Sequence, residues 1–137
     1  MKPVRYPLTV FYDASCPLCA TELHALRDLD KAGRIELVDC SAADFSDDGL
    51  RGECVTREAL MARLHARDAR GRWLSGPDCF EAVYRSVGLE RAARFWGSPR
   101  LRPLLERVYP WVARNRQALS RLHLHALVRA LIPRPGP

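Results

Sequence analysis

The sequence predicts an α/β fold in which a strand–helix–strand unit, a β-hairpin and a further helix precede a C-terminal α-helical extension. Residues 8–12, Leu-Thr-Val-Phe-Tyr, form the β-branched and aromatic run of a buried strand. From Pro17 to Gly33 apolar residues recur at roughly helical spacing, and residues 34–39 alternate like a second strand. A short helical crossover makes these two strands parallel.

The segment from Thr56 to Arg67 fits two structures. Thr56 is a suitable helix cap, whereas the alternation of apolar and polar residues up to Arg67 is typical of a half-exposed strand. We favour a strand over about residues 61–67, because residues 68–72 have the composition of a hairpin turn that leads into Trp73 and Leu74.

Helices and loops account for the rest of the chain. Residues 41–52 are rich in Asp, Ser and Gly and predict a loop with a turn of helix. A helix is expected from Gly76-Pro77-Asp78 to about Val87, ended by Gly88. Beyond it the pattern is helical, with breaks expected near residues 97–99 and at two prolines, Pro103 and Pro110, and with the last five residues frayed.

Size and composition predict one compact unit. The chain has 137 residues, of which 47% are hydrophobic and 28% charged. We divide it into an N-terminal α/β domain over residues 1–90 and a basic helical extension over residues 91–137 that packs on it. It contains no apolar run of the ~18 residues that span a bilayer, and its start lacks a signal-peptide pattern. A cytoplasmic protein is therefore expected.

The positive charge is concentrated in the C-terminal third. Residues 1–84 carry 11 Lys and Arg against 14 Asp and Glu, whereas residues 85–137 carry 11 against 2. Because amphipathic helices mostly pack, we favour a helical cap with a solvated arginine face. A cationic helix that contacts a membrane surface is possible but not favoured. Nucleic-acid binding is not expected, since no recognised motif accompanies the charge.

The five cysteines predict chemistry rather than a disulfide framework, because their number is odd and a reducing compartment keeps thiols free. Cys16-Pro17-Leu18-Cys19 is a C-x-x-C between a strand and a helix start. The helix dipole and first-turn amides lower the pKa of Cys16, which makes it the attacking sulfur. Cys19 lies one turn further and can close a disulfide with it.

A structural zinc site is the alternative for this motif. It would need Cys16 and Cys19 together with two further ligands from a set without a second close pair, namely Cys40, Cys54, Cys79 and His65. Each of the three additional cysteines is more simply a small buried residue. We expect no metal, and we assign no role to three isolated histidines, His24, His123 and His125.

Residues 11–19, Phe-Tyr-Asp-Ala-Ser-Cys-Pro-Leu-Cys, with Glu22 just after them, resemble the Asp-x-x-Cys-x-x-Cys motif of the DCC family of thiol-disulfide oxidoreductases. Residues 65–71, 76–80 and 109–116 resemble the remaining blocks of that family, in the same order. The resemblance implies a thioredoxin-like fold. It also implies that the redox pair is Cys16 and Cys19 and that the acidic residue of the motif is Asp13.

Asp13 has two possible roles. As a general base at the strand end it would accept the proton of Cys19 during resolution, and as a structural residue it would bond local amides in the turn. A carboxylate near Cys16 also opposes its thiolate. We keep Asp13 with Cys16 and Cys19 in the catalytic set. Glu22 is left out, because we expect it to be a solvated helix residue.

Two departures from a standard thioredoxin stand out. No proline precedes the strand expected at 61–67, where thioredoxins place a cis-proline, and residues 55–58 are Val-Thr-Arg-Glu. Substrate docking is therefore expected to differ. Cys79 stands where the family more often has a small apolar residue, so it is an incidental substitution or an extra thiol.

These observations predict a thiol-disulfide oxidoreductase that exchanges disulfides with a protein or a small thiol and needs no bound cofactor. The alternative is a non-enzymatic thioredoxin-like binding module whose cationic C-terminal helix contacts a partner or a membrane surface.

Overall fold

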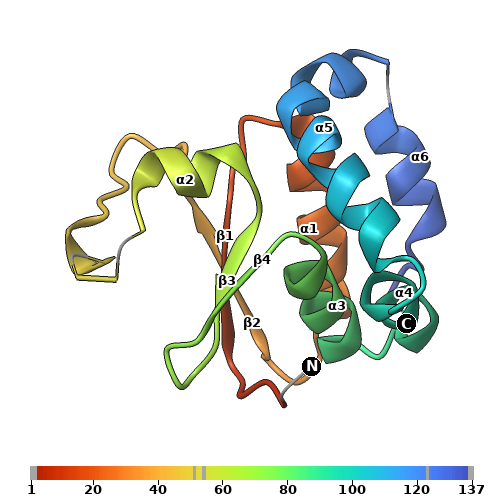
Figure 1. Cartoon of the computed structure of the whole chain (residues 1–137), viewed down its shortest axis with the longest axis horizontal. Coiled ribbons are helices and arrows are strands. Elements are labelled where there is room, and N and C mark those ends of the chain that lie inside the picture. Colours follow the sequence, from red (N-terminus) through yellow and green to blue (C-terminus); the bar gives the residue numbers. More distant parts are fainter. Residues whose placement is uncertain (1–2, 51, 54, 123, 136–137) are drawn as a thin grey trace.

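The computed structural model describes residues 3–50, 52–53, 55–122 and 124–135 (Figure 1). Strands and helices alternate in the first two thirds of the chain, and helices alone follow. The elements are β1 (Leu8–Tyr12), α1 (Pro17–Leu29), β2 (Ile35–Asp39), η1 (Asp48–Leu50), α2 (Arg57–Ala62), β3 (His65–Arg67), β4 (Trp73–Ser75), α3 (Pro77–Ser86), α4 (Glu90–Gly97), α5 (Arg102–Arg121) and α6 (Leu124–Leu131).

The sheet is mixed and has the strand order β2-β1-β3-β4. β1 pairs with β2 in parallel, from Leu8 opposite Ile35 to Tyr12 opposite Asp39, and β3 pairs antiparallel with β1 and with β4. This arrangement confirms the predicted strand–helix–strand unit, the hairpin and the thioredoxin-like α/β class with a helical C-terminal part.

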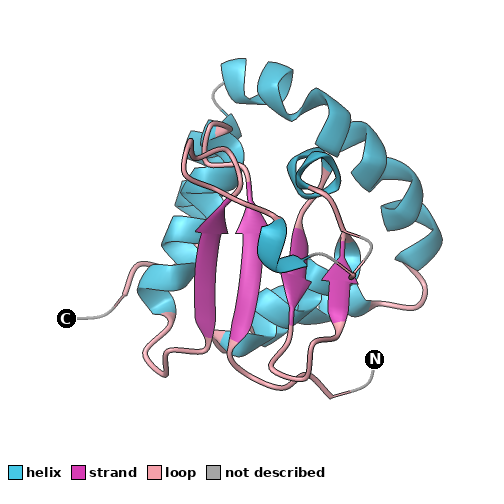
Figure 2. Ribbon diagram, turned by 90° about the vertical axis from the view of Figure 1, so that its left-hand side faces the viewer, coloured by secondary structure: helices cyan, strands magenta, loops and turns pink. Residues whose placement is uncertain are grey.

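The two faces of the sheet are covered unequally (Figure 1, Figure 2). Five helices, α1 and α3 to α6, lie on one face, and α2 with the loop before it lies on the other. β1 supplies both cores because its side chains alternate. Leu8, Val10 and Tyr12 pack under the five helices, and Phe11 packs with Leu60 under α2.

The predicted strand over residues 61–67 is wrong in its first half. α2 continues to Ala62, and β3 begins at His65. Thr56 caps α2 by accepting a hydrogen bond from the amide of Ala59 (3.2 Å), and Leu60 is buried in the smaller core. The cap and this burial favour the helix, and the alternating pattern holds only for the short strand that follows.

The breaks predicted at Pro103 and Pro110 are also wrong, whereas the break near residues 97–99 is confirmed by the end of α4 at Gly97. Pro103 lies in the first turn of α5, where its missing amide costs nothing. Pro110 lies inside α5, next to Tyr109, whose burial holds the helix on the sheet domain.

The C-terminal helices contact the helices that cover the sheet. α5 and α6 both pack on α1, and α4 packs on α3. The division at residue 90 stays a prediction. Among the described residues, no helix is both long and apolar enough to span a membrane.

Candidate functional site

Cys16 and Cys19 lie at the junction between β1 and α1. Cys16 is the residue that caps α1, and Pro17 occupies the first turn. The turn before the helix is closed by the amide of Cys16, which donates to the carbonyl of Asp13 (3.2 Å). Both cysteines are free thiols, and Cys16 is fully buried while Cys19 is half-buried.

The surroundings of Cys16 stabilise its thiolate and lower its pKa to about 5. The largest contribution is a hydrogen bond from the thiol of Cys19, and the amide of Cys19, the hydroxyl of Ser120 and the charge of Arg116 add to it. Burial opposes these contributions but does not outweigh them. These contacts therefore favour the ionised form of Cys16 at neutral pH.

Cys19 has the opposite character. Its pKa is strongly raised, first by the hydrogen bond it donates to Cys16, then by burial and by the charge of the Cys16 thiolate. The pair is thus one thiolate and one thiol that share a proton between them. This division of roles fits an attacking sulfur and a resolving sulfur.

Ser120 reaches the site from the far end of α5. Its Oγ lies 3.7 Å from Cys16 Sγ and accepts a hydrogen bond from the amide of Leu18 (3.2 Å). Because the amide uses the oxygen as an acceptor, the hydroxyl proton is free to point at the sulfur. Ser120 is itself buried, so its hydroxyl is fixed as a donor to the thiolate.

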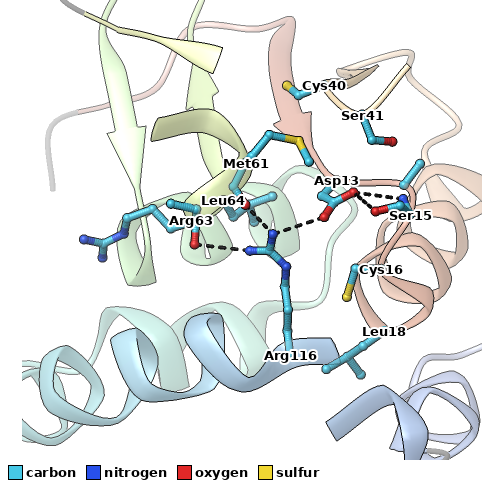
Figure 3. Close-up of polar contacts among 12 residues, drawn as sticks. Asp13, Ser15, Cys16, Leu18, Cys40, Ser41, Met61, Arg63, Leu64 and Arg116 are labelled. Carbon is cyan, nitrogen blue, oxygen red and sulfur yellow. Dashed lines mark hydrogen bonds and ion pairs between the residues drawn. The ribbon is translucent and has the colours of Figure 1, made fainter. Parts of the chain in front are cut away.

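Arg116, one turn before Ser120 on α5, joins three segments (Figure 3). Its guanidinium binds the carboxylate of Asp13 (3.1 Å) and donates to the carbonyls of Met61 and Ala62 at the end of α2. Its side chain is only 17% exposed, so water screens this ion pair weakly. Neither Arg116 nor Ser120 was identified from the sequence.

Asp13 is 4% exposed, and its two oxygens face different partners. Oδ1 accepts hydrogen bonds from the amide and hydroxyl of Ser15 (2.9 and 2.5 Å), and Oδ2 is paired with Arg116. Asp13 thus holds the turn before Cys16. Its predicted part in proton transfer stays a prediction.

Glu22 is not the solvated residue that the sequence suggested. It is half-buried and lines, with Cys19, a cavity of about 80 Å3. Its Oε1 accepts a hydrogen bond from the hydroxyl of Tyr84 (2.6 Å). Burial raises the pKa of this carboxyl, and the bond from Tyr84 only partly offsets the rise.

The remaining thiols differ from those of Cys16 and Cys19. Cys40 and Cys79 are buried, and burial raises the pKa of Cys40 to about 11 and that of Cys79 further. Cys54 lies outside the described residues. Within the described part of the chain, no group of three or more His, Cys, Asp or Glu side chains is placed to hold a metal ion.

The segment before β3 also lacks a proline. With β3 beginning at His65, the residues directly before it are Arg63 and Leu64. The carbonyls of Met61 and Ala62 in this segment face Arg116 rather than open solvent. The departure from thioredoxin noted in the sequence therefore extends to the structure.

A thioredoxin-like fold with an ionised cysteine at a helix start defines the class of thiol-disulfide oxidoreductases. The model of the DCC1-like thiol-disulfide oxidoreductase family matches residues 10–122, and the chain belongs to this family. It is 28% identical over 131 residues to an uncharacterized chloroplastic protein of Arabidopsis thaliana. The match covers 94% of this chain and 60% of that relative's length. No solved structure matches the chain.

Replacing Ser120 by alanine is expected to raise the pKa of Cys16 above its value of about 5. A hydrogen bond to a charged group contributes ~1.5–3 kcal/mol, so the ionisation constant should change about tenfold or more. Thiolate absorbance at 240 nm against pH measures this directly. Gln117→Ala, an exposed neighbour on the same helix, is the control, and an equal titration curve for Ser120→Ala contradicts the assignment.

Proposed function

We propose that this chain catalyses thiol-disulfide exchange with a disulfide or dithiol of a protein or a small thiol, through Cys16 and Cys19. Family membership supports a redox role in general. The observation that carries the specific proposal is the low pKa of Cys16 beside a Cys19 whose pKa is raised. A metal-binding or purely structural thiol pair does not require this asymmetry.

The reaction proceeds in two exchanges. The Cys16 thiolate attacks one sulfur of a substrate disulfide, which forms a mixed disulfide and releases the other sulfur as a thiolate. Cys19 then loses its proton and attacks Cys16 Sγ, which forms the Cys16–Cys19 disulfide and releases the second substrate sulfur. The substrate gains two electrons and the pair loses two. A cellular thiol reductant reopens the pair, and no bound cofactor is needed.

Access to Cys16 requires a local movement. Its side chain has no exposed surface, and Ser120 at the end of α5 lies over its sulfur. A substrate sulfur cannot reach a fully covered thiolate, so the first exchange needs the end of α5 to move away from the first turn of α1. Such openings of a helix end occur on a microsecond-to-second scale.

We keep Asp13 in the proposed site beside the two cysteines. Its carboxylate orients the turn before Cys16 through Ser15 and neutralises Arg116. The rate of the second exchange in Asp13→Asn tests whether this carboxylate also accepts a proton. The compartment we propose is the cytoplasm, on the odd number of cysteines, and localisation of a tagged chain tests it, because the chloroplastic description belongs to the relative.

A second proposal concerns the outer surface of the helical third. Among the described residues, all strongly exposed large hydrophobic side chains come from α4 to α6 and the turn after α5, namely Phe95, Leu104, Val108, Trp111, Leu122, Leu127 and Leu131. On α5, Leu104, Val108 and Trp111 are four and three residues apart and form one stripe. Exposed Arg107 and Arg114 flank it. We propose that this stripe adsorbs to an anionic membrane surface.

The redox proposal predicts one reversible disulfide, between Cys16 and Cys19. Mass-spectrometric thiol mapping across dithiothreitol redox buffers should show this bond appear with a single midpoint, in a sample that contains no zinc. Cys16→Ser should abolish disulfide exchange, and Cys40→Ala, which removes a buried thiol of raised pKa, should preserve it. A pair that stays unlinked in every buffer, or that holds stoichiometric zinc, contradicts the proposal.

The membrane proposal predicts co-sedimentation with vesicles that contain phosphatidylserine at low salt and its loss at high salt, because screening weakens the arginine contribution. A Leu104→Ser, Trp111→Ser double variant should bind several-fold more weakly, since both side chains lie about half exposed on the stripe. Vesicles of phosphatidylcholine alone are the control. Equal sedimentation with both lipids, or none at low salt, overturns this proposal and leaves the redox proposal intact.

A further inference from the structure

The second exchange needs a proton acceptor for Cys19. A thiol is a poor nucleophile, and the pKa of Cys19 is strongly raised by its bond to Cys16 and by burial. Once Cys16 forms the mixed disulfide, its sulfur no longer carries the negative charge that accepts the hydrogen bond from the Cys19 thiol. Another group near Cys19 must then take the proton so that its sulfur can attack.

Asp13 is poorly suited to this task. Both of its oxygens are engaged, Oδ1 by Ser15 and Oδ2 by the guanidinium of Arg116. To accept a further hydrogen bond from Cys19, the carboxylate would have to give up or weaken its contact with Ser15 or with Arg116.

Glu22 lies near Cys19, where it can receive the proton of the Cys19 thiol. On an α-helix, residues three apart lie on the same face with their Cβ atoms about 5–6 Å from each other, so Glu22 stands one turn along α1 from Cys19. Both side chains line the same cavity of about 80 Å3. This volume exceeds the ~15 Å3 that one water needs, so a proton can cross it directly or through one water.

The hydrogen bonds of Glu22 leave it an acceptor. Tyr84 donates to Oε1, and Oε2 has no hydrogen-bond partner within the described part of the chain. Burial raises the pKa of Tyr84 further above its ordinary value, so its phenol stays protonated and keeps donating. One carboxylate oxygen is thus fixed by α3, and the other remains available to the cavity.

We propose that Glu22 accepts the proton of Cys19 when Cys19 resolves the mixed disulfide, and that Tyr84 positions the Glu22 carboxylate for this step. This inference rests on the proposed exchange reaction. The proton moves from Cys19 Sγ to Glu22, the new bond forms between Cys19 Sγ and Cys16 Sγ, and the substrate sulfur leaves as a thiolate. Glu22 afterwards returns its proton to solvent.

The charges around Glu22 suit a base of intermediate strength. Cys19 of α1, Tyr12 of β1 and Tyr109 of α5 line the cavity with Glu22. α3 adds Tyr84, which donates its hydroxyl proton to Glu22, and the protonated Cys79, which interacts electrostatically with it. The cations that line this cavity and the adjoining groove are Arg63, Arg116, Arg91 and Arg94, and the other acids are Asp13 in the cavity and Glu90 in the groove. Desolvation dominates over these charges and raises the pKa of Glu22, toward the operating pH of a general base.

The test separates the two exchanges in one experiment. The reduced full chain is mixed with 5,5'-dithiobis(2-nitrobenzoate), and thionitrobenzoate release is followed by stopped flow. The first release reports attack by Cys16, and the second reports resolution by Cys19. Cys19→Ser must retain the first phase and lose the second, which assigns the phases.

Glu22→Gln keeps the shape of the side chain and removes its basicity. It should leave the first phase unchanged and slow the second by about a hundredfold, since general base catalysis contributes ~10²–10⁴-fold. The residual second phase should then rise with pH without a plateau, because only hydroxide deprotonates Cys19. Asp28→Asn, an exposed acid on the same helix, should leave both phases as in the wild type.

Tyr84→Phe provides a second variant that retains the carboxylate. The bond from Tyr84 lowers the pKa of Glu22, so its removal should move the midpoint of the second-phase pH profile upward. If no first phase occurs in the wild type, the exchange reaction itself fails. If both phases occur and Glu22→Gln leaves the second phase and its pH profile unchanged, or if Asp13→Asn alone slows it, Glu22 is not the acceptor.

Discussion

The ion pair between Arg116 and Asp13 is the contact on which the arrangement of this site depends. It joins the turn that presents Cys16 to a helix that begins some ninety residues later in the chain, and the same guanidinium bonds to the carbonyls of Met61 and Ala62 at the end of α2. A buried carboxylate near a thiolate would raise the pKa of that thiol. Because Arg116 neutralises Asp13, the turn can contain both the carboxylate and an ionised Cys16.

The site combines strong ionisation with complete burial, which usually oppose each other. The Cys16 thiolate is compensated by short-range donors from α1 itself and by Ser120 from α5, so it loses its contact with water without losing its charge. The C-terminal helix therefore both stabilises the nucleophile and covers it. Because oxidation of a thiolate depends on its exposure, the burial of Cys16 under Ser120 of α5 limits oxidation of its sulfur, and in the proposed reaction the sulfur becomes accessible when the end of α5 moves.

Local patterns predicted much of the fold, and contacts distant in sequence account for most of what was missed. The strand, turn and helix around Cys16 follow from apolar spacing within some thirty residues. The sequence contains many arginines and several serines, and no local pattern distinguishes Arg116 and Ser120 as the ones whose side chains are directed into the site. The proximity of Glu22 to Cys19 could have been predicted from the sequence, because residues three positions apart on a helix share one face. Pro110 failed as a breaker because tertiary packing of Tyr109 outweighs one lost hydrogen bond.

The reduction potential of the Cys16–Cys19 pair in the wild type and in Arg116→Gln tests most directly whether α5 completes this site. Arg116 stabilises the thiolate of the reduced form, so its loss should make the potential more negative, by roughly 30 mV for each 1.4 kcal/mol of lost stabilisation. Circular dichroism on the same samples establishes that the variant is folded. An unchanged potential in a folded Arg116→Gln protein would contradict the account.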